Sequence, residues 1–232
     1  MTENTASSHK RRIKSFILRQ GRYTRAQKNA LDHHWKDYGI EFTDSFINFE
    51  QVFGRDAPVT LEIGFGNGDS LLQQAIEHPE NNYVGIEVHG PGVGHLIHRI
   101  CEKQLSNIRV IRFDAIDVLN KQIPDNSLDC LQLFFPDPWH KKKHNKRRIV
   151  QAAFLQLVRS KLKTGGRLHM ATDWQHYAEQ MLKLGDEADG FKNLSGIGQY
   201  TSNRSPRVET KFERRGLKLG HGIWDIKHEK TR

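Results

Sequence analysis

A single carboxylate, Asp137, lies between two prolines and shortly before a dense block of positive charge. Pro136 and Pro138 restrict the backbone around it, which suits an acid that must point in one direction. Six of the eight residues 141–148 are lysine or arginine. Such cations neutralise phosphates and release condensed counterions, so the block favours a nucleic-acid partner. The acid at its edge indicates chemistry on that nucleic acid, although a solvated loop or a nuclear-import signal has a similar composition.

A glycine-rich turn, LEIGFGNGDS, follows one predicted strand and precedes a predicted helix. Gly64, Gly66 and Gly68 would let the backbone approach a ligand and take positive φ. Asp69 stands where the dinucleotide fingerprint has its third glycine, and its charge would repel a pyrophosphate. A ligand with an adenosine but no phosphate fits better. S-adenosylmethionine is such a ligand, and its positive sulfonium and amino groups suit Glu62 and Asp69. A plain strand-to-helix turn with Asp69 as N-cap is the simpler alternative.

Three more carboxylates follow predicted strands. Glu87 ends the second strand, 23 residues after Gly64, about where a carboxylate can accept hydrogen bonds from ribose hydroxyls. Asp137 and Asp173 each come just after a later strand. In an open parallel sheet the ligand crevice lies outside the carboxyl ends of the strands. We therefore expect these acids to face one site.

The elements that must position these residues alternate along the chain. From Val59 onward, short β-rich runs alternate with helical runs, which predicts an α/β fold with a doubly wound, mostly parallel sheet and helices on both faces. Residues 148–162 carry apolar side chains near a period of 3.6, including Ile149, Ala153 and Leu157, and predict one packed helix. The chain after about residue 191 predicts final antiparallel strands, with a short helical turn at residues 210–215.

Length and charge limit the function classes. The 232 residues suffice for one packed domain with an extension. We place a single domain at residues 56–232, after a basic and partly flexible N-terminal arm at residues 1–55. The 36 lysines and arginines exceed the 27 acids by nine, which favours a polyanionic partner or an acidic membrane surface.

The remaining composition argues against a membrane and an oxidising compartment. No apolar run approaches the roughly 18 residues of a spanning helix, and no secretory signal pattern is present. A mitochondrial transit peptide stays an alternative, because residues 4–31 hold eight lysines or arginines and no acid. Cys101 and Cys130 form no CxxC motif, so we expect a reducing cytoplasm.

His140 and His144 have the i, i+4 spacing of paired metal ligands. The surrounding positive charge opposes a divalent cation, and no carboxylate pair lies nearby to offset it. We therefore expect no metal.

Several motifs together resemble one known family. LEIGFGNG, YVGIEV, FFPDPWHKKKHNKRR, ATDW and ETKFERRG, with FILRQGRYTRAQ near the N-terminus, resemble the bacterial tRNA (guanine-N7-)-methyltransferases over residues 13–224. The resemblance implies a class I, Rossmann-like methyltransferase fold, with a seven-stranded sheet that has an antiparallel edge strand. It also implies tRNA (guanine(46)-N7)-methyltransferase activity, in which S-adenosylmethionine donates a methyl group to N7 of a guanine in the tRNA variable loop.

The resemblance also implies roles for individual residues. The cofactor contacts fall on Glu62, Glu87, Asp114 and Asp137, to which the glycine turn adds Gly64 and Gly66. The substrate contacts fall on Lys141, Asp173, Thr210, Lys211, Phe212 and Glu213. The RNA contacts fall on Lys143, His144, Asn145, Lys146, Arg147 and Arg148.

Guanine N7 carries a free lone pair, so it can attack a sulfonium methyl without a general base. We therefore assign Asp137 to the reacting centre, where it would offset the positive charge that forms on the base. Asp173 would hold the guanine, and the division between the two acids stays open. The alternatives are a non-catalytic RNA-binding protein with the same fold and a methyltransferase for another RNA or a small amine. An NAD-dependent oxidoreductase is disfavoured by Asp69. We expect tRNA as partner and no obligate protein partner.

Overall fold

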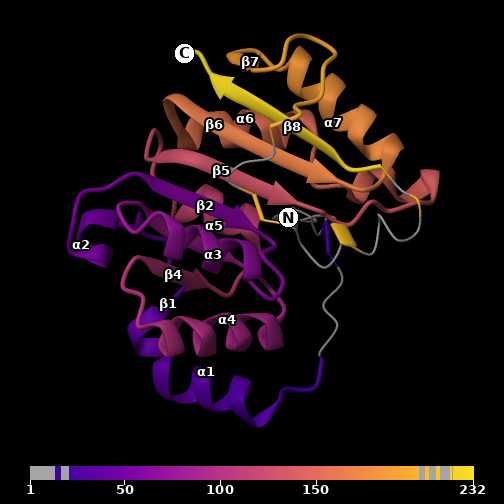
Figure 1. Ribbon diagram of the computed structural model, residues 1–232. Helices are drawn as coiled ribbons and strands as arrows, with labels where there is room; N and C mark the ends of the chain where they lie inside the picture. Colours follow the sequence, from indigo (N-terminus) through magenta and orange to yellow (C-terminus); the bar gives the residue numbers. More distant parts are fainter. Residues whose placement is uncertain (1–13, 17–20, 204–206, 209–212, 215–219, 221) are drawn as a thin grey trace, which may run out of the picture.

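The structure, a computed structural model, describes residues 14–16, 21–203, 207–208, 213–214, 220 and 222–232. The described residues form one eight-stranded sheet with the order β1-β4-β3-β2-β5-β6-β8-β7 (Figure 1). Strands β1 to β6 pair with one another in parallel, and β8 is antiparallel to both β6 and β7. The strands are β1 (Gly39–Ile40), β2 (Val59–Ile63), β3 (Asn82–Ile86), β4 (Ile108–Ile111), β5 (Leu128–Phe134), β6 (Leu162–Thr172), β7 (Phe191–Asn193) and β8 (Trp224–Lys230).

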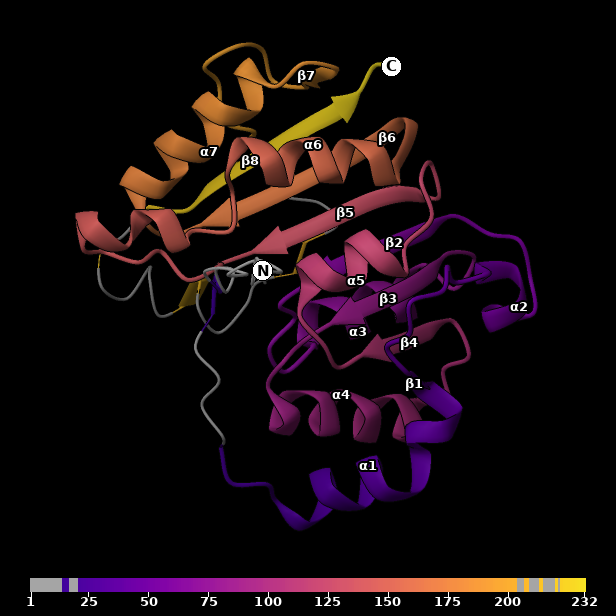
Figure 2. The same cartoon turned by 180° about the vertical axis from the view of Figure 1, so that it is seen from behind.

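Helices cover both faces of this sheet. The helices are α1 (Arg25–Tyr38), α2 (Phe49–Phe53), α3 (Asp69–Glu77), α4 (Gly90–Lys103), α5 (Ala115–Lys121), η1 (Lys142–Arg147), α6 (Ala152–Lys161) and α7 (Gln175–Glu187). One hydrophobic cluster joins α1, α3 and α4 to β3 and β4, and the other joins α5, α6 and α7 to the central strands. Helix α3 lies in front of the sheet in Figure 1, and α5 and α6 lie in front of it in Figure 2.

This arrangement confirms the predicted doubly wound α/β class. Two details differ from the expected seven strands with an antiparallel edge. Gly39 and Ile40 add a short parallel strand beside β4, and the antiparallel β8 lies one place in from the edge, which β7 forms. Strands of two and three residues are too short to show a periodic pattern in sequence.

The predicted helix at residues 148–162 is shorter than expected. Helix α6 begins at Ala152 and ends at Lys161, and it buries Phe154, Leu155 and Val158. Ala153, placed on the packed face by the sequence, is exposed. Ile149 and Leu157, predicted on the same face, are partly buried against the core, and the residues before Ala152 belong to the connection from η1.

Part of the predicted N-terminal arm packs against the domain. Thr24 caps α1 through a capping box: its Oγ1 accepts from Gln27 N at 3.2 Å, and Gln27 Oε1 accepts from Thr24 N at 2.8 Å. Gly94 of α4 lies so close to α1 that an added Cβ would stand 2.6 Å from the Gln27 carbonyl oxygen. The chain from residue 25 therefore joins the helical layer, and the division at residue 56 stays a prediction.

No helix among the described residues combines the length and apolar character needed to traverse a bilayer. In the same part of the chain, no group of three or more His, Cys, Asp and Glu side chains forms a candidate metal site.

Candidate active site

A cavity of about 1060 Å³, the central cavity, lies at the carboxyl ends of β2, β3, β4 and β5. All the residues predicted to contact the donor line it: Glu62, Gly64, Gly66, Glu87, Asp114 and Asp137. Lys141, predicted to contact the substrate, also lines it. The sheet thus brings together side chains from four separate strand ends, as expected for a parallel α/β fold.

The glycine turn has the backbone that its sequence suggests. Gly64, Gly66 and Gly68 have φ values of 72°, 61° and 78°, in the left-handed region that favours glycine. A Cβ on Gly64 or Gly66 would meet nothing within 4 Å, whereas one on Gly68 would lie 2.8 Å from the Leu96 side chain. The first two glycines are therefore required for backbone conformation, and the third also for the packing of α4.

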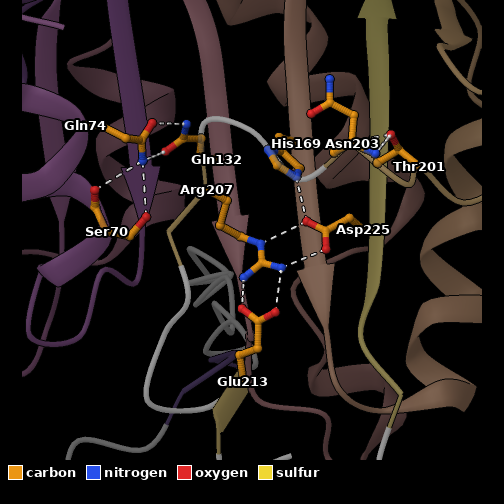
Figure 3. Close-up of polar contacts among 9 residues, drawn as sticks. All are labelled: Ser70, Gln74, Gln132, His169, Thr201, Asn203, Arg207, Glu213 and Asp225. Carbon is orange, nitrogen blue, oxygen red and sulfur yellow. Dashed lines mark hydrogen bonds and ion pairs between the residues drawn. The ribbon is translucent and has the colours of Figure 1, made fainter. Parts of the chain in front are cut away.

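A buried amide pair holds this turn in place. Gln74 of α3 and Gln132 of β5 exchange reciprocal side-chain hydrogen bonds of 3.1 and 2.7 Å, and Gln74 Nε2 also donates to Ser70 Oγ at 3.2 Å (Figure 3). Both glutamines are buried. The pair fixes the start of α3 relative to β5, and so the glycine turn relative to the Asp137 loop that follows β5.

Glu62 is the most unusual acid of the central cavity. Its side chain is 3% exposed, and its Oε2 has no hydrogen-bond partner among the described residues. Burial, helped by the nearby Glu87 charge, raises the pKa of Glu62 to about 8. Glu62 lines the central cavity, so a cationic ligand group there, as S-adenosylmethionine would supply, would favour the ionised form of this buried acid.

Backbone amides orient Glu87 and Asp114. Glu87 Oε1 accepts from Val88 N at 2.7 Å and from His89 N at 2.9 Å, while Oε2 accepts from Gly66 N at 2.9 Å. Asp114 caps α5 and accepts from Ile116 N at 3.1 Å. A carboxylate has about four acceptor positions, so these bonds leave Glu87 capacity for a ribose hydroxyl while fixing its direction.

The loop that carries Asp137 is strained on both sides. Phe135 has φ 50° and Trp139 has φ 47°, a conformation that bulky residues rarely adopt and that costs of order 1–3 kcal/mol each. Three hydrogen bonds from distant segments hold the loop. Phe135 N donates to Ala171 O at 2.8 Å, Trp139 Nε1 donates to Ser15 O at 3.0 Å, and Arg148 Nε donates to Pro138 O at 2.8 Å. Asp137 is exposed at the wall of the central cavity.

The basic block divides into exposed and structural residues. Lys141, Lys142, Lys143 and Lys146 are exposed, and His144 and Asn145 are half-buried. The Arg147 guanidinium lies 3.9 Å from the centre of the Trp139 ring, and it donates to the carbonyl oxygens of Lys14 and Phe16 at 3.2 and 3.4 Å.

Arg148 is a correction to the sequence analysis. Its side chain is 2% exposed, so it is not available to an RNA phosphate, although its sequence neighbours are. The composition of the block gave no sign of this burial.

The predicted substrate residues are dispersed. Asp173, expected to face the same site as Glu87 and Asp137, instead lines a second hollow of about 440 Å³ together with Trp174 and Trp224. The rings of His140, in the central cavity, and Trp174 lie 4.2 Å apart edge to face, so the two hollows are neighbours. Thr210, Lys211 and Phe212 lie outside the described residues.

Glu213 belongs to a buried ion network that the sequence did not reveal. Arg207 pairs with Glu213 and donates two bonds to Asp225, Nε to Oδ1 at 2.9 Å and Nη2 to Oδ2 at 2.8 Å (Figure 3). Asp225 Oδ1 also accepts from His169 Nε2 at 2.8 Å. Glu213 is 2% exposed. The Arg207 guanidinium lies 5.4 Å from the centre of the Phe135 ring. The network therefore contacts the Asp137 loop through Phe135.

The pKa values in this network follow from its hydrogen bonds. Burial alone would lower the pKa of Arg207, but the bonds to Asp225 and Glu213 outweigh it and raise the pKa. Burial alone would raise the pKa of Asp225, but the bonds from His169 and Arg207 lower it. Burial lowers the pKa of His169 in spite of Asp225. Arg207 and Asp225 are therefore both ionised, and Glu213 pairs with the same guanidinium.

Comparison with known proteins identifies the family. A family model described as "Putative methyltransferase" matches residues 56–226. The tRNA (guanine-N(7)-)-methyltransferase of Hydrogenovibrio crunogenus is 54% identical over 99% of this chain and 100% of its own length. The chain belongs to the tRNA (guanine-N7-)-methyltransferase family. The protein of the same name from Escherichia coli strain K12 is 54% identical over 96% of this chain and 93% of its own.

Solved structures agree at the level of the fold. The 16S rRNA methyltransferase KamB has a TM-score of 0.57 at 14% identity, covering 81% of this chain and 95% of its own. The aminoglycoside resistance methyltransferase NpmB1 has a TM-score of 0.55 at 15% identity, covering 79% and 92%. Both support the class I methyltransferase fold.

Proposed function

We propose that this protein transfers a methyl group from S-adenosylmethionine to N7 of a guanine in tRNA, the guanine at position 46 of the variable loop. The observation that carries the proposal is the central cavity, because Glu62, Glu87, Asp114 and the loop of Asp137 all line it. The family supports the same reaction, because its curated relatives carry the name tRNA (guanine-N(7)-)-methyltransferase.

On the donor side, the chain supplies acidic side chains and a glycine backbone that the ligand can approach closely. S-adenosylmethionine, when bound, supplies an electrophilic methyl on a positively charged sulfonium. Glu62, which lines the cavity, would offset positive charge of this ligand once ionised, and Glu87 would accept from ribose hydroxyls. Gly64 and Gly66, with open space at their Cβ positions, leave room for the ligand against the backbone.

On the acceptor side, the chain supplies placement and a compensating charge. Guanine N7 already has a free lone pair, so no side chain has to remove a proton, and the site needs no basic histidine or lysine. Holding N7 and the methyl carbon in line at roughly 3–3.5 Å supplies much of the acceleration. Asp137 would offset the positive charge that develops on the base. Asp173 would accept from guanine N1–H and the amino group, a donor pair that adenine lacks.

Moving the target guanine out of the tRNA structure costs free energy, and the basic block would offset that cost. A guanine in a tertiary pair must leave its stack to reach the cavity, at a cost of a few kcal/mol. The exposed Lys141, Lys142, Lys143 and Lys146 would recover that cost through phosphate contacts.

The test is incubation of the protein with tRNA lacking the modification and with methyl-labelled donor, followed by mapping of the labelled nucleoside. The proposal expects N7-methylguanosine at position 46 and no label in tRNA in which adenine replaces that guanine. A label in another nucleoside would establish a methyltransferase for another site. Calorimetry that detects no donor binding would instead favour a non-catalytic RNA-binding protein.

We also propose that the reaction takes place in the cytoplasm. Cys101 and Cys130 are both free thiols, and burial raises the pKa of Cys130 to about 12. Unpaired thiols suit a reducing compartment. No protein partner is part of the proposal.

A further inference from the structure

Arg148 ends the basic block but differs from the lysines before it, because its side chain is 2% exposed. Its Nε donates to the carbonyl oxygen of Pro138 at 2.8 Å. Pro138 directly follows Asp137 in the chain. We propose that Arg148 is a positioning residue for Asp137, acting through the Pro138 carbonyl, and not an RNA contact. The proposal rests on the proposed function of Asp137.

The other side of the guanidinium is anchored to α7. Nη1 of Arg148 donates to Gln180 Oε1 at 2.6 Å and lies 3.0 Å from His176 Nδ1, which accepts because arginine is a donor only. The guanidinium lies 4.6 Å from the centre of the Tyr177 ring. One rigid fork thus joins the Asp137 loop to three side chains of a helix.

Helix α7 also contacts Val150, which follows Arg148 by two residues in the chain. Tyr177, fully buried, accepts from Val150 N through its hydroxyl at 3.2 Å, and Gln180 Nε2 donates to Val150 O at 3.1 Å. Arg148 is therefore held between two points of attachment, and it transmits the position of α7 to the loop.

The electrostatic cost of this arrangement supports a specific role. None of the Arg148 partners among the described residues is a carboxylate; they are a carbonyl, an amide, an imidazole and an aromatic ring. Burial lowers the pKa of Arg148. Burying a cation without an acid is costly, and a surface arginine would serve phosphate binding without that cost.

The strained backbone of the Asp137 loop requires contacts that hold it in place. Phe135 and Trp139, on either side of the Pro136–Asp137–Pro138 tripeptide, both have positive φ. Strained aromatic residues keep that conformation only when the surrounding contacts over-determine it. Loss of the Arg148 bond would let the Pro138 carbonyl turn and would move the Asp137 carboxylate relative to the donor side of the cavity.

The test compares Arg148→Met, Arg148→Lys and Gln180→Leu with two controls. Lys146→Met removes an exposed lysine of the same block, and Lys183→Met removes an exposed lysine of α7 outside the site. Each variant is measured for kcat and KM with tRNA over a range of salt, for donor binding by calorimetry, and for thermal unfolding. Amide hydrogen exchange of the loop gives a readout that does not depend on activity.

We expect Arg148→Met to lower kcat about tenfold or more, with KM for tRNA within about twofold of the wild type. The salt dependence of tRNA binding should stay unchanged, and exchange of the Phe135 amide should accelerate while exchange in the glycine turn does not. Arg148→Lys should restore kcat only in part, because an ammonium lacks the planar fork. Gln180→Leu, which removes no charge, should lower kcat in the same direction.

Lys146→Met should behave differently, raising KM and reducing the salt slope by about 1. Lys183→Met should match the wild type throughout. The proposal is overturned if Arg148→Met reduces the salt slope as Lys146→Met does, or if it lowers only the unfolding temperature. It is also overturned if loop exchange is unchanged, a result that can be read even if the wild type fails to methylate tRNA.

Discussion

The donor side and the acceptor side of the central cavity are built in different ways. On the donor side, each acid stands near a strand end or at a helix cap, and backbone amides orient Glu87 and Asp114. Three of these amides lie within two residues of the acid, and the fourth belongs to Gly66 in the glycine turn, 21 residues from Glu87. On the acceptor side, the Asp137 loop is strained and held by Ala171, Ser15 and Arg148. Mostly local backbone amides orient the acids of the first half, whereas contacts with segments 10 or more residues away hold the loop of the second. The acceptor side should therefore be the more sensitive to substitutions at a distance.

The largest effect should come from the loop itself. Asp137→Ala should abolish methyl transfer, because the positive charge on the base would lose its compensating carboxylate. Affinity for tRNA, measured by filter binding, should stay within a few fold, since the lysines remain. Equal turnover by the variant would refute the assignment of Asp137 to the reacting centre.

A distant substitution should also disturb the acceptor side. Arg207→Met would leave Glu213 and Asp225 buried without their cation, and breaking such a pair costs about 3–5 kcal/mol. The free energy of unfolding, from urea titration, measures that loss. Lys192→Met, an exposed change on β7, is the control. A loss below about 1 kcal/mol would mean that the network contributes little more than an exposed ion pair.

The donor side should respond to pH through Glu62. The pKa of Glu62 is about 8, against an ordinary value of 4.5, so the folded protein holds this proton more tightly than the unfolded chain. The stability of the donor-free protein should therefore fall as pH rises from about 4.5 to 8 and level off above. Glu62→Gln should flatten this dependence, measured by urea unfolding at several pH values.

The binding of S-adenosylmethionine gives a second measurement of the protonation of Glu62. A cationic donor favours ionised Glu62, so binding at neutral pH should release a proton. Calorimetry in two buffers of different ionisation enthalpy detects that release, and Glu62→Gln should abolish it. Identical proton release by the variant would assign the proton to another group.

The smallest effect should come from the exposed lysines. Lys143→Ala with Lys146→Ala should weaken tRNA binding and reduce the salt slope by about 1 for each lysine, with donor affinity unchanged. Affinity measured between low and moderate salt gives the slope. An unchanged slope would remove these lysines from the RNA-contacting surface.

The comparison also explains how far the sequence could predict the site. Glu87 and Asp137 could be placed at one cavity because the ends of parallel strands meet at one edge of a sheet, a rule that needs only the order of elements. Glu62 was noted beside the glycine turn, and Asp114 came only from the resemblance to the family. The glycine turn was recognised from its glycine spacing between a predicted strand and a predicted helix, and its positive φ values are those that glycine allows.

The acceptor side could not be predicted from local patterns. The burial of Arg148 depends on Gln180 and His176, which lie 32 and 28 residues along the chain. Arg207 meets Asp225 across 18 residues with no characteristic spacing. The start of α6 was misplaced because the segment after η1 continues an apolar pattern without continuing a helix. In each case tertiary contacts, not periodicity, decide the structure.

The most direct test of the account is a crystal structure of the protein with S-adenosylmethionine bound. The account predicts the adenosyl group beside Glu87 and Asp114, and the sulfonium methyl directed toward the loop of Asp137. A donor bound outside the central cavity, or a methyl group turned away from Asp137, would contradict it.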